Sequence, residues 1–209
     1  MVELIWATPN AEALITKMAR VSNPSNEDNL ETAPRLLHYL VKHKHWSPFE
    51  MANMCVKINT QRDISAQILR HRSFTYQEFS TRYSEVTDVL EPIQLRRQDH
   101  KNRQNSIEDL DHKLLVELEE MITNIQARTM YAYKHLLASG VAKECARRIL
   151  PLNTNTTMYM NGTLRSWIHY IQLRTGLETQ KEHRMIAQQI KDVFCAEFPV
   201  IATAAFNMH

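Results

Sequence analysis

The chain has 209 residues, of which 44% are hydrophobic and 23% charged, and its formal net charge is +2. These values are typical of a globular protein of one domain, and the near-neutral charge gives no support for a polyanionic partner. No apolar run approaches the ~20 residues of a membrane helix, and the first residues lack the pattern of a secretory signal. We therefore expect a single domain over 1–209 that is cytoplasmic and binds no membrane.

Glycine and cysteine usage excludes several kinds of site. The chain has three glycines, far apart in the sequence, whereas a Walker loop or a dinucleotide GxGxxG loop needs several close together. Its three cysteines include no CxxC pair, which argues against a disulfide framework and a zinc site. A bound nucleotide would have to be held by side chains and helix N-termini.

Hydrophobic periodicity and capping residues predict the elements in chain order. The first half is expected to hold a strand over 2–7, a helix over 11–20, a helix from Thr32, a strand over 51–58 and a helix over 61–71. Residues 74–96 are expected to be irregular, with short strand-like pieces over 86–95, and 94–105 to be a solvated loop. Helices are expected over 109–139, 142–149, 164–171 and 179–198. The fold class is therefore α+β, mostly helical with a small antiparallel sheet.

The segment RHRSFTYQEFSTRYSE over 70–85 has few apolar residues and many basic and hydroxyl side chains. Arginines at this density are typical of sites that hold phosphate or carboxylate, because a guanidinium donates two parallel hydrogen bonds. The segment therefore predicts a phosphorylated ligand. A different reading is a module for single-stranded nucleic acid, in which the arginines contact phosphates and the aromatic rings of the segment stack on bases. Glu78 and the near-neutral chain weigh against that alternative.

Two further groups of polar residues need an interpretation. The helix expected around 164–174 places Arg165, His169 and Gln172 on one face, opposite its apolar stripe. His38, His43 and His45 lie close in sequence, but their spacing matches no zinc motif and no cysteine or acidic group completes a set. We expect no metal site.

The 70–83 segment resembles the signature of the flavin-dependent thymidylate synthases, RHR-x-x-S-x-N-E-x-S-x-R-Y. Thr75 and Gln77 stand where the family has Ser and Asn. The stretch HWSPFE over 45–50 resembles a second family element, except that Met51 replaces a His, and 19–22 resembles an early one. The resemblance extends from about residue 19 to 185.

The resemblance implies the reductive methylation of dUMP to dTMP, with methylenetetrahydrofolate as carbon donor and FAD, reduced by NADPH, as hydride carrier. It also implies a homotetramer whose sites are shared between subunits. The residues implied to bind dUMP are Gln67, Glu78, Ser80, Arg82, Arg147 and Arg174. Those implied to contact the flavin are Ser22, His45, Arg70, His71, Arg72, Glu78, Thr163 and His169.

A cysteine nucleophile is not expected, because Cys55 and Cys195 lie in apolar patterns. Cys145, which precedes Ala146 and Arg147, is the one credible exception, although it too is read as a small core residue. Charge that develops on the uracil oxygens would then need electrostatic stabilisation. We expect Arg174 to supply it as the catalytic residue.

Overall fold

The computed structural model describes residues 1–87 and 90–206. Its internal contacts divide the chain into two compact units, named unit 1 and unit 2. Unit 1 comprises Met1–Ile58, Ile68–Gln77 and Met158–His209, and unit 2 comprises Asn59–Gln67 and Glu78–Thr157. Because the segments of the two units alternate along the chain, no single cut in the sequence separates them. The fold is α+β, as expected, and the single domain over 1–209 stays a prediction.

A sheet of order β1-β2-β6-β3 forms the centre of the fold. Strand β1 (Val2–Ala7) pairs antiparallel with β2 (Asn53–Gln61), with a register shift between Leu4 and Trp6. The other two strands are β6 (Asn155–Thr163) and β3 (Thr75–Glu78). Alternate side chains in the first part of β2, Met54, Val56 and Ile58, are fully buried, as in a strand with one covered face. Cys55, between them, is 7% exposed.

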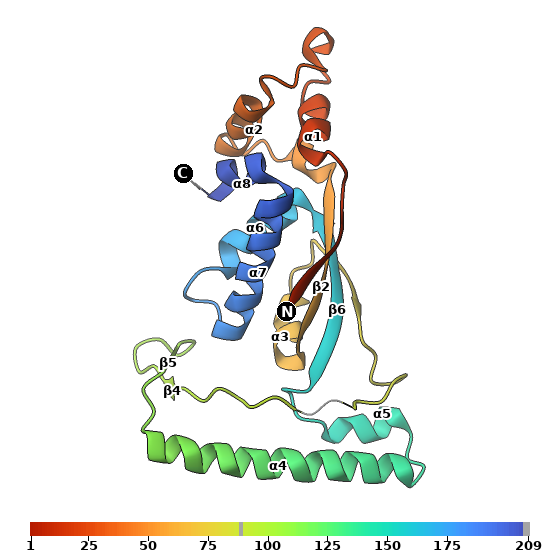
Figure 1. Cartoon of the computed structure of the whole chain (residues 1–209), viewed down its shortest axis with the longest axis vertical. Helices are drawn as coiled ribbons and strands as arrows, with labels where there is room; N and C mark the ends of the chain where they lie inside the picture. Colours follow the sequence, from red (N-terminus) through yellow and green to blue (C-terminus); the bar gives the residue numbers. More distant parts are fainter. Residues whose placement is uncertain (88–89, 207–209) are drawn as a thin grey trace. The chain divides into compact units, whose positions relative to one another are not determined.

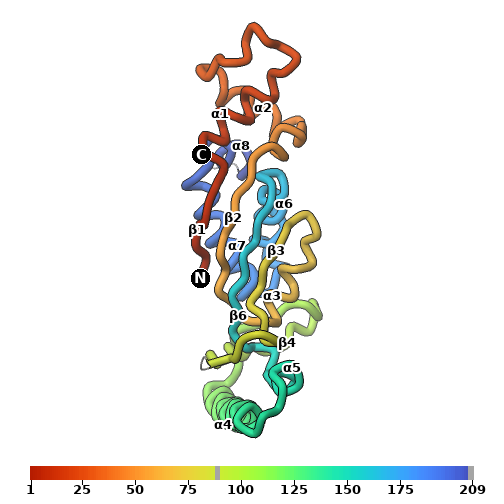
Figure 2. Tube along the Cα trace, turned by 90° about the vertical axis from the view of Figure 1, so that its right-hand side faces the viewer, coloured from red at the N-terminus to blue at the C-terminus, as the bar shows by residue number. Residues whose placement is uncertain are grey.

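Unit 1 holds five of the described helices. They are α1 (Ala11–Ala19), α2 (Ala33–Lys42), α6 (Leu164–Arg174), α7 (Lys181–Glu197) and α8 (Pro199–Phe206), with single 3-10 turns at Pro24–Asn26 and Ser47–Glu50. Figure 1 shows α6 and α7 on one side of the strands and α8 against α2, and the α2–α8 contact is extensive. Figure 2, turned by 90°, shows β1, β2 and β6 side by side with α7 behind them. The helices therefore cover one face of this part of the sheet.

The apolar stripe predicted on α6 is buried. Leu164, Trp167, Ile168 and Ile171 are each at most 1% exposed. Trp167 donates its indole N–H to the Met54 carbonyl at 2.9 Å, which ties α6 to β2. Gly162, at the end of β6, lies against the ring of Phe74, and a Cβ at this position would be 2.4 Å from Phe74 Cδ1.

Unit 2 is organised around α4 (His112–Ala138). It also contains most of α3 (Arg62–Ile68), the short α5 (Lys143–Ala146), the 3-10 turn Arg147–Ile149 and the two-residue strands β4 (Arg97–Gln98) and β5 (Ser106–Ile107). Its buried core consists of Val86, Tyr133 and Ala146, with partly buried apolar side chains packed around them. The Tyr133 hydroxyl accepts a hydrogen bond from the Val86 N–H at 3.2 Å.

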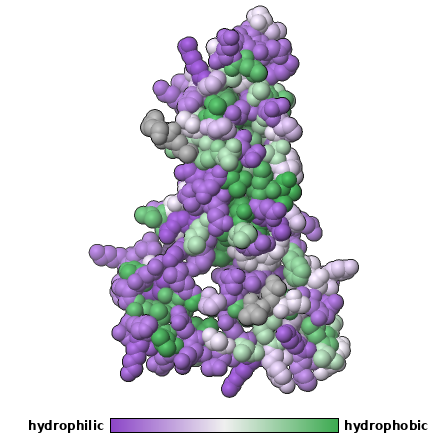
Figure 3. Space-filling view, viewed as in Figure 1, coloured by the Kyte–Doolittle hydropathy of each residue, from purple (hydrophilic) through white to green (hydrophobic). Residues whose placement is uncertain are grey.

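Helix α4 lies within the range expected for it, 109–139, but begins three residues later. Asp111 caps the first turn by accepting from the N–H groups of Lys113 and Leu114, and Gly140 follows the helix with φ +80°. Leu114, Leu118, Met121 and Ile125 recur at helical spacing and form an apolar stripe that is largely exposed, with 56% of Ile125 accessible. Figure 3 shows hydrophobic side chains breaking the hydrophilic surface where α4 begins.

Several other expectations are corrected by the structure. Strand β6 was not predicted, because its alternating Asn, Thr and Met residues form no apolar run. The third helix ends at Ile68 rather than residue 71. The strand-like pieces expected over 86–95 form no strand in their described residues, and 88–89 lie outside the described part. Across residues 1–87 and 90–206, no helix is both long and apolar enough to cross a membrane.

Candidate functional site

The turn that carries Arg70, His71 and Arg72 follows α3 directly. The His71 N–H donates to the Ile68 carbonyl at 3.0 Å, which closes the turn. The Tyr76 hydroxyl lies 2.9 Å from the Ile68 carbonyl and 2.8 Å from the His71 carbonyl. Burial raises the pKa of Tyr76, so its hydroxyl keeps the proton that these carbonyls accept. Arg70 and Arg72 are exposed, whereas the His71 side chain is half-buried.

The His71 imidazole contacts Arg174, the last residue of α6. Arg174 Nε donates to His71 Nε2 at 2.8 Å. A guanidinium can only donate, so His71 Nε2 must be the unprotonated nitrogen and the ring proton must be on Nδ1. Burial lowers the pKa of His71 to about 4, and the positive charges of Arg174 and His169 add to this effect. His71 is therefore neutral at physiological pH. Arg174 makes no other hydrogen bond within the described residues, so its two terminal nitrogens remain available.

A second histidine lies behind this contact. The Tyr170 hydroxyl is 2.9 Å from His183 Nε2, and both side chains are fully buried. The ring of Tyr170 meets the ring of His71 edge-on, with 4.8 Å between centroids. Burial, followed by the charge of Arg174, lowers the pKa of His183 to about 4. Both rings are therefore uncharged next to a permanent cation.

Of the five remaining residues predicted for the flavin, Ser22, His45, Thr163 and His169 lie in unit 1 and Glu78 lies in unit 2. His169 is exposed on α6, on the polar face predicted for that helix. Thr163 is the N-cap of α6, where its hydroxyl accepts from the Ser166 N–H at 3.2 Å. Ser22 and His45 are exposed in the turns after α1 and α2. No hydrogen bond in the described structure joins Ser22 or His45 to the His71–Arg174 contact.

In unit 2, Glu78 is held by two hydroxyl groups. Its Oε1 accepts from Ser65 Oγ, on α3, and from Thr156 Oγ1, on β6, each at 2.9 Å. Gln67 lies two residues after Ser65 on α3. The carboxylate of Glu78 is therefore fixed between elements before and after the signature, as an ordering role for this residue requires.

Ser80, Arg82 and Arg147 are also brought close together in unit 2. Thr81 is 3% exposed, and its hydroxyl accepts from Arg147 Nη1 at 3.3 Å. The Ser80 carbonyl accepts from the N–H groups of the third and fourth residues after it, which makes this segment a tight turn. Arg82 forms an exposed ion pair with Glu144 at 3.2 Å. The turn thus carries two arginines and a serine within a few residues.

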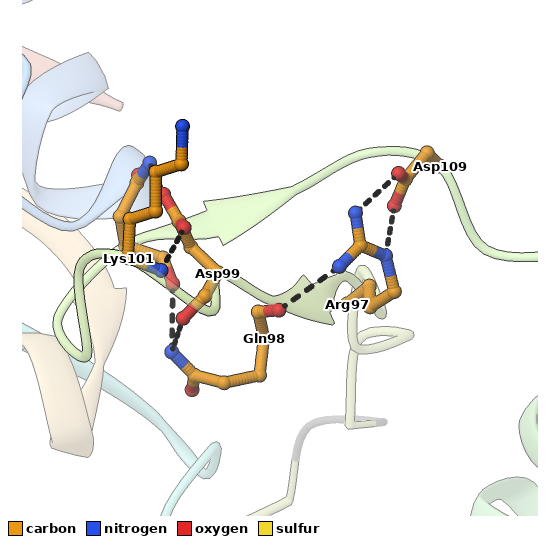
Figure 4. A network of polar contacts seen from close by, with 6 residues as sticks. Arg97, Gln98, Asp99, Lys101 and Asp109 are labelled. Atoms are coloured by element: carbon orange, nitrogen blue, oxygen red, sulfur yellow. Dashed lines mark hydrogen bonds and ion pairs between the residues drawn. The ribbon is translucent and has the colours of Figure 1, made fainter.

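The basic segment 94–105 is mostly an exposed loop, as expected, in which only Arg97–Gln98 forms a short strand that pairs with Ser106–Ile107. Figure 4 shows Arg97 bound to both carboxylate oxygens of Asp109, at 2.8 Å and 2.6 Å. The Arg97 hydrogen bond lowers the pKa of Asp109. Asp99 accepts from the Lys101 N–H at 2.8 Å, which lowers the Asp99 pKa and closes the turn. Of the three arginines in this segment, Arg97 is thus paired with a carboxylate of the same chain.

The three cysteines differ in exposure. Cys55 is buried in β2, where burial raises its pKa, and the pKa of Cys195 is raised for the same reason. A raised pKa keeps a thiol protonated and unreactive. Cys145 is exposed, so the expectation that it is a core residue was wrong; it lies on the solvent side of the short α5.

Sequence reasoning missed six residues of these contacts: Ser65, Thr81, Glu144, Thr156, Tyr170 and His183. A signal existed for the last two. Tyr170 lies within the apolar stripe of α6, and His183 lies one turn before Ile186 and Ala187 on the buried stripe of α7. A polar tip inside a buried stripe requires a partner. The two partners could not be paired from the sequence, because helix packing decides which stripes meet.

Comparison with known proteins assigns the chain to a family. A family model described as "Thymidylate synthase complementing protein" matches residues 3–200. The chain is 52% identical over 194 residues to "Probable flavin-dependent thymidylate synthase" of Paramecium bursaria Chlorella virus 1, covering 93% of this chain and 90% of that protein. It is 48% identical over 193 residues to the flavin-dependent thymidylate synthase of Synechocystis sp., covering 92% and 88%.

A solved structure of a UMP/dUMP methylase, PolB from Streptomyces cacaoi bound with 5-Br dUMP, superposes with a TM-score of 0.85. The two sequences are 26% identical, and the match covers 99% of this chain and 94% of PolB. Sequence and fold therefore agree, and the chain belongs to the flavin-dependent thymidylate synthase family.

Proposed function

We propose that this protein converts dUMP to dTMP, with methylenetetrahydrofolate as carbon donor and FAD, reduced by NADPH, as hydride carrier. Family membership supports the reaction, and the similar methylase was solved with a dUMP analogue. The observation that carries the proposal is the Arg174 guanidinium, whose Nε is fixed on neutral His71 at 2.8 Å. Its terminal nitrogens can then meet a uracil ring with little loss of conformational entropy.

The residues present fit a flavin dinucleotide. Arg70 and Arg72 expose two guanidinium groups on one turn, and the diphosphate of FAD needs such donors in the absence of a glycine-rich loop. Ser22, His45, Thr163, His169 and, from unit 2, Glu78 are the further proposed contacts. Bound FAD would supply the hydride, which no side chain can provide.

The turn that contains Ser80 and Arg82 is proposed to hold the 5′-phosphate of dUMP. Arg147 supports this role, because it donates to the Thr81 hydroxyl and so lies beside the turn. The ion pair between Arg82 and Glu144 is exposed, and exposed pairs are weak enough to exchange for a phosphate. Gln67 and Glu78 are proposed to contact the nucleotide from the start and end of the signature.

We propose that no thiolate attacks the ring. The raised pKa values of Cys55 and Cys195 support this, since both thiols stay protonated near neutral pH. Negative charge on the uracil oxygens would instead be stabilised by Arg174, a permanent cation whose two terminal nitrogens make no hydrogen bond within the described residues. The role of Arg174 is therefore to bind the ring and to hold the charge that develops on it.

The resemblance also supports a homotetramer with sites shared between subunits, which we propose as the working form. The exposed apolar stripe of α4 is consistent with a chain that buries more surface on association. A cytoplasmic location is proposed because Cys55, Cys145 and Cys195 are all free thiols.

The first test is the visible absorbance spectrum of the purified protein, recorded before and after dUMP is added. A flavin spectrum that shifts with dUMP is expected, followed by dTMP formation when NADPH and methylenetetrahydrofolate are supplied. A colourless protein that takes up no FAD would refute the proposal. Salt-dependent binding of single-stranded oligonucleotide by the same sample would support the alternative.

A further inference from the structure

Two histidines and a tyrosine lie behind Arg174, away from its terminal nitrogens. His71 comes from the turn after α3, Tyr170 from α6 and His183 from α7. Tyr170 and Arg174 are one helical turn apart, so both reach the same imidazole: Arg174 through its Nε at 2.8 Å and Tyr170 through its ring at 4.8 Å. Three elements of unit 1 therefore converge on the His71 ring.

This ring is a hydrogen-bond acceptor that the surrounding groups keep uncharged. Around it lie Arg174 and His169 from α6, the Tyr170 ring at 4.8 Å and His183 from α7 at 6.5 Å between ring centroids, and Tyr76, whose hydroxyl donates to the His71 carbonyl. None of these groups is an anion that would stabilise an imidazolium. A proton on Nε2 would remove the acceptor of Arg174 and place two cations in contact.

The Tyr170–His183 pair fixes the ring from behind. Both side chains are fully buried, and they satisfy each other at 2.9 Å. Burial limits the alternative arrangements of this pair, because a buried polar group that moves away from its partner loses a hydrogen bond. The Phe74 ring lies 6.4 Å from the His71 ring and 5.9 Å from the Tyr170 ring, between centroids.

We propose that His71, Tyr170 and His183 are positioning residues for Arg174, an inference that rests on the proposed catalytic role of Arg174. The Tyr170–His183 pair holds His71 as a neutral Nδ1–H imidazole. His71 Nε2 in turn accepts from Arg174 Nε and so orients the guanidinium. His71 is then separate in function from Arg70 and Arg72. Those exposed arginines bind flavin, whereas the imidazole serves the arginine that meets the substrate ring.

The test combines NMR of the purified protein with ligand binding and kinetics. In protein labelled with ¹⁵N-histidine and ¹⁵N-arginine, we expect His71 in the Nδ1–H form at pH 7. We also expect an Arg174 Nε–H signal, assigned by its loss in Arg174→Lys, that exchanges slowly with water. His71→Ala should abolish that protection and lower kcat ~10²-fold without loss of bound FAD. His71→Gln places an acceptor near the position of Nε2. It should therefore restore most of the protection of the Arg174 Nε–H and most of kcat.

The double variant Tyr170→Phe/His183→Leu removes the hydrogen bond between the two side chains together with both of its polar groups. We expect it to fold, to retain FAD, to raise the KM for dUMP and to exchange the Arg174 Nε–H faster. Phe194→Leu is the matched control, since it alters the buried face of α7 among Phe198 and Phe206, away from His71. It should leave the Arg174 signal unchanged.

Three results would overturn the proposal: an Nε2–H or charged His71 at pH 7, an Arg174 signal indifferent to His71→Ala, or loss of FAD as the first effect of that variant. The NMR measurement needs no turnover. Wild-type protein with the expected signals but no dTMP formation would therefore refute the proposed function and leave the positioning contact standing.

Discussion

At the scale of single residues, the proposed chemistry depends on one permanent cation. Arg174 ends α6 and uses one of its three nitrogens on His71, so the guanidinium is held at its base and open at its tip. Lysine could not replace it, because a single ammonium cannot donate to His71 and to a ring oxygen in fixed directions.

Arg174→Ala should lower kcat at least ~10²-fold, the cost of one oxyanion donor, while FAD stays bound. The reason is that the variant removes charge stabilisation at the uracil ring and leaves Arg70 and Arg72 intact. Initial rates of dTMP formation and the ratio of flavin to protein absorbance measure both quantities. Arg128→Ala, an exposed arginine on α4, is the control and should change neither. If flavin were lost together with activity, Arg174 would have a different role.

The lowered pKa of His183 predicts how stability depends on pH. In the unfolded chain this histidine binds a proton near its ordinary pKa of 6.5, but in the folded protein only near about 4. The unfolded state therefore binds more protons between these values, and the free energy of unfolding falls as the pH decreases through this window. From pH 7.5 to pH 5 the loss from His183 is about 2 kcal/mol.

Urea unfolding of wild type and Tyr170→Phe/His183→Leu at both pH values tests this expectation. The double variant should lose about 2 kcal/mol less than wild type on acidification, because it has no buried imidazole at position 183. His71 adds a smaller effect of the same sign in both proteins, since it is only half-buried. Equal losses in the two proteins would contradict the assignment.

At the scale of elements, the structure shows a side-chain cap at the start of α4 that the sequence analysis did not name. Asp111 accepts from the N–H groups of Lys113 and Leu114, at 3.0 and 3.1 Å. Asp111→Ala should lower the free energy of unfolding by about 1 kcal/mol, the usual cost of an N-cap, and Asp111→Asn by only a few tenths. Chemical denaturation followed by circular dichroism measures the difference. Equal effects of the two substitutions would mean that the cap contributes nothing.

The helices could be predicted because their apolar residues recur at helical spacing and their ends carry caps or breakers, as on α6 and α4. The strand β6 could not, because NTTMYMNGT offers two methionines among hydroxyl and amide side chains, a pattern as typical of loops. The segment is a strand because of its neighbours in the sheet. With β2 and β3 on either side, the backbone of β6 is paired and its alternate side chains are covered. Pairing of this kind is non-local and leaves little trace in the segment itself.

For the candidate site, the sequence motifs could be predicted, but the contacts between residues far apart in the sequence could not. A contiguous signature marked Arg70–Tyr83, and separate motifs marked Arg147 and Arg174, because each is a short pattern. That His71 and Arg174, 103 residues apart, share a hydrogen bond follows only from packing. The same is true of the hydroxyls on Glu78, which come from α3 and β6.

At the scale of the whole molecule, the stripe on α4 predicts association. Leu114, Met121 and Ile125 are 43%, 51% and 56% exposed on one face of the helix. If the protein works as a homotetramer, light scattering should give about four times the 24.5 kDa of one chain. Met121→Glu/Ile125→Glu should shift that mass downward, because burying two carboxylates in an apolar contact is costly. Thr123→Glu, on another face, is the control.

An unchanged mass for the double variant would mean that this stripe takes no part in the assembly. A wild-type mass of 24.5 kDa at micromolar concentration would instead contradict the homotetramer itself. The two outcomes are separable, since the first concerns one helix face and the second the oligomeric state.

The contact between Gly162 and Phe74 has a consequence for how this sequence can change over time. The ring occupies the place where a side chain at 162 would begin, and Trp167 lies 4.6 Å from it on the other side. An alanine at position 162 would therefore be tolerated only together with a smaller residue at position 74. Conversely, a smaller residue at position 74 would leave a cavity unless position 162 carries a larger side chain. We therefore expect substitutions at these two positions, 88 residues apart, to occur together. Because Phe74 belongs to the signature segment, the residues allowed at this end of β6 depend on those allowed in the proposed site.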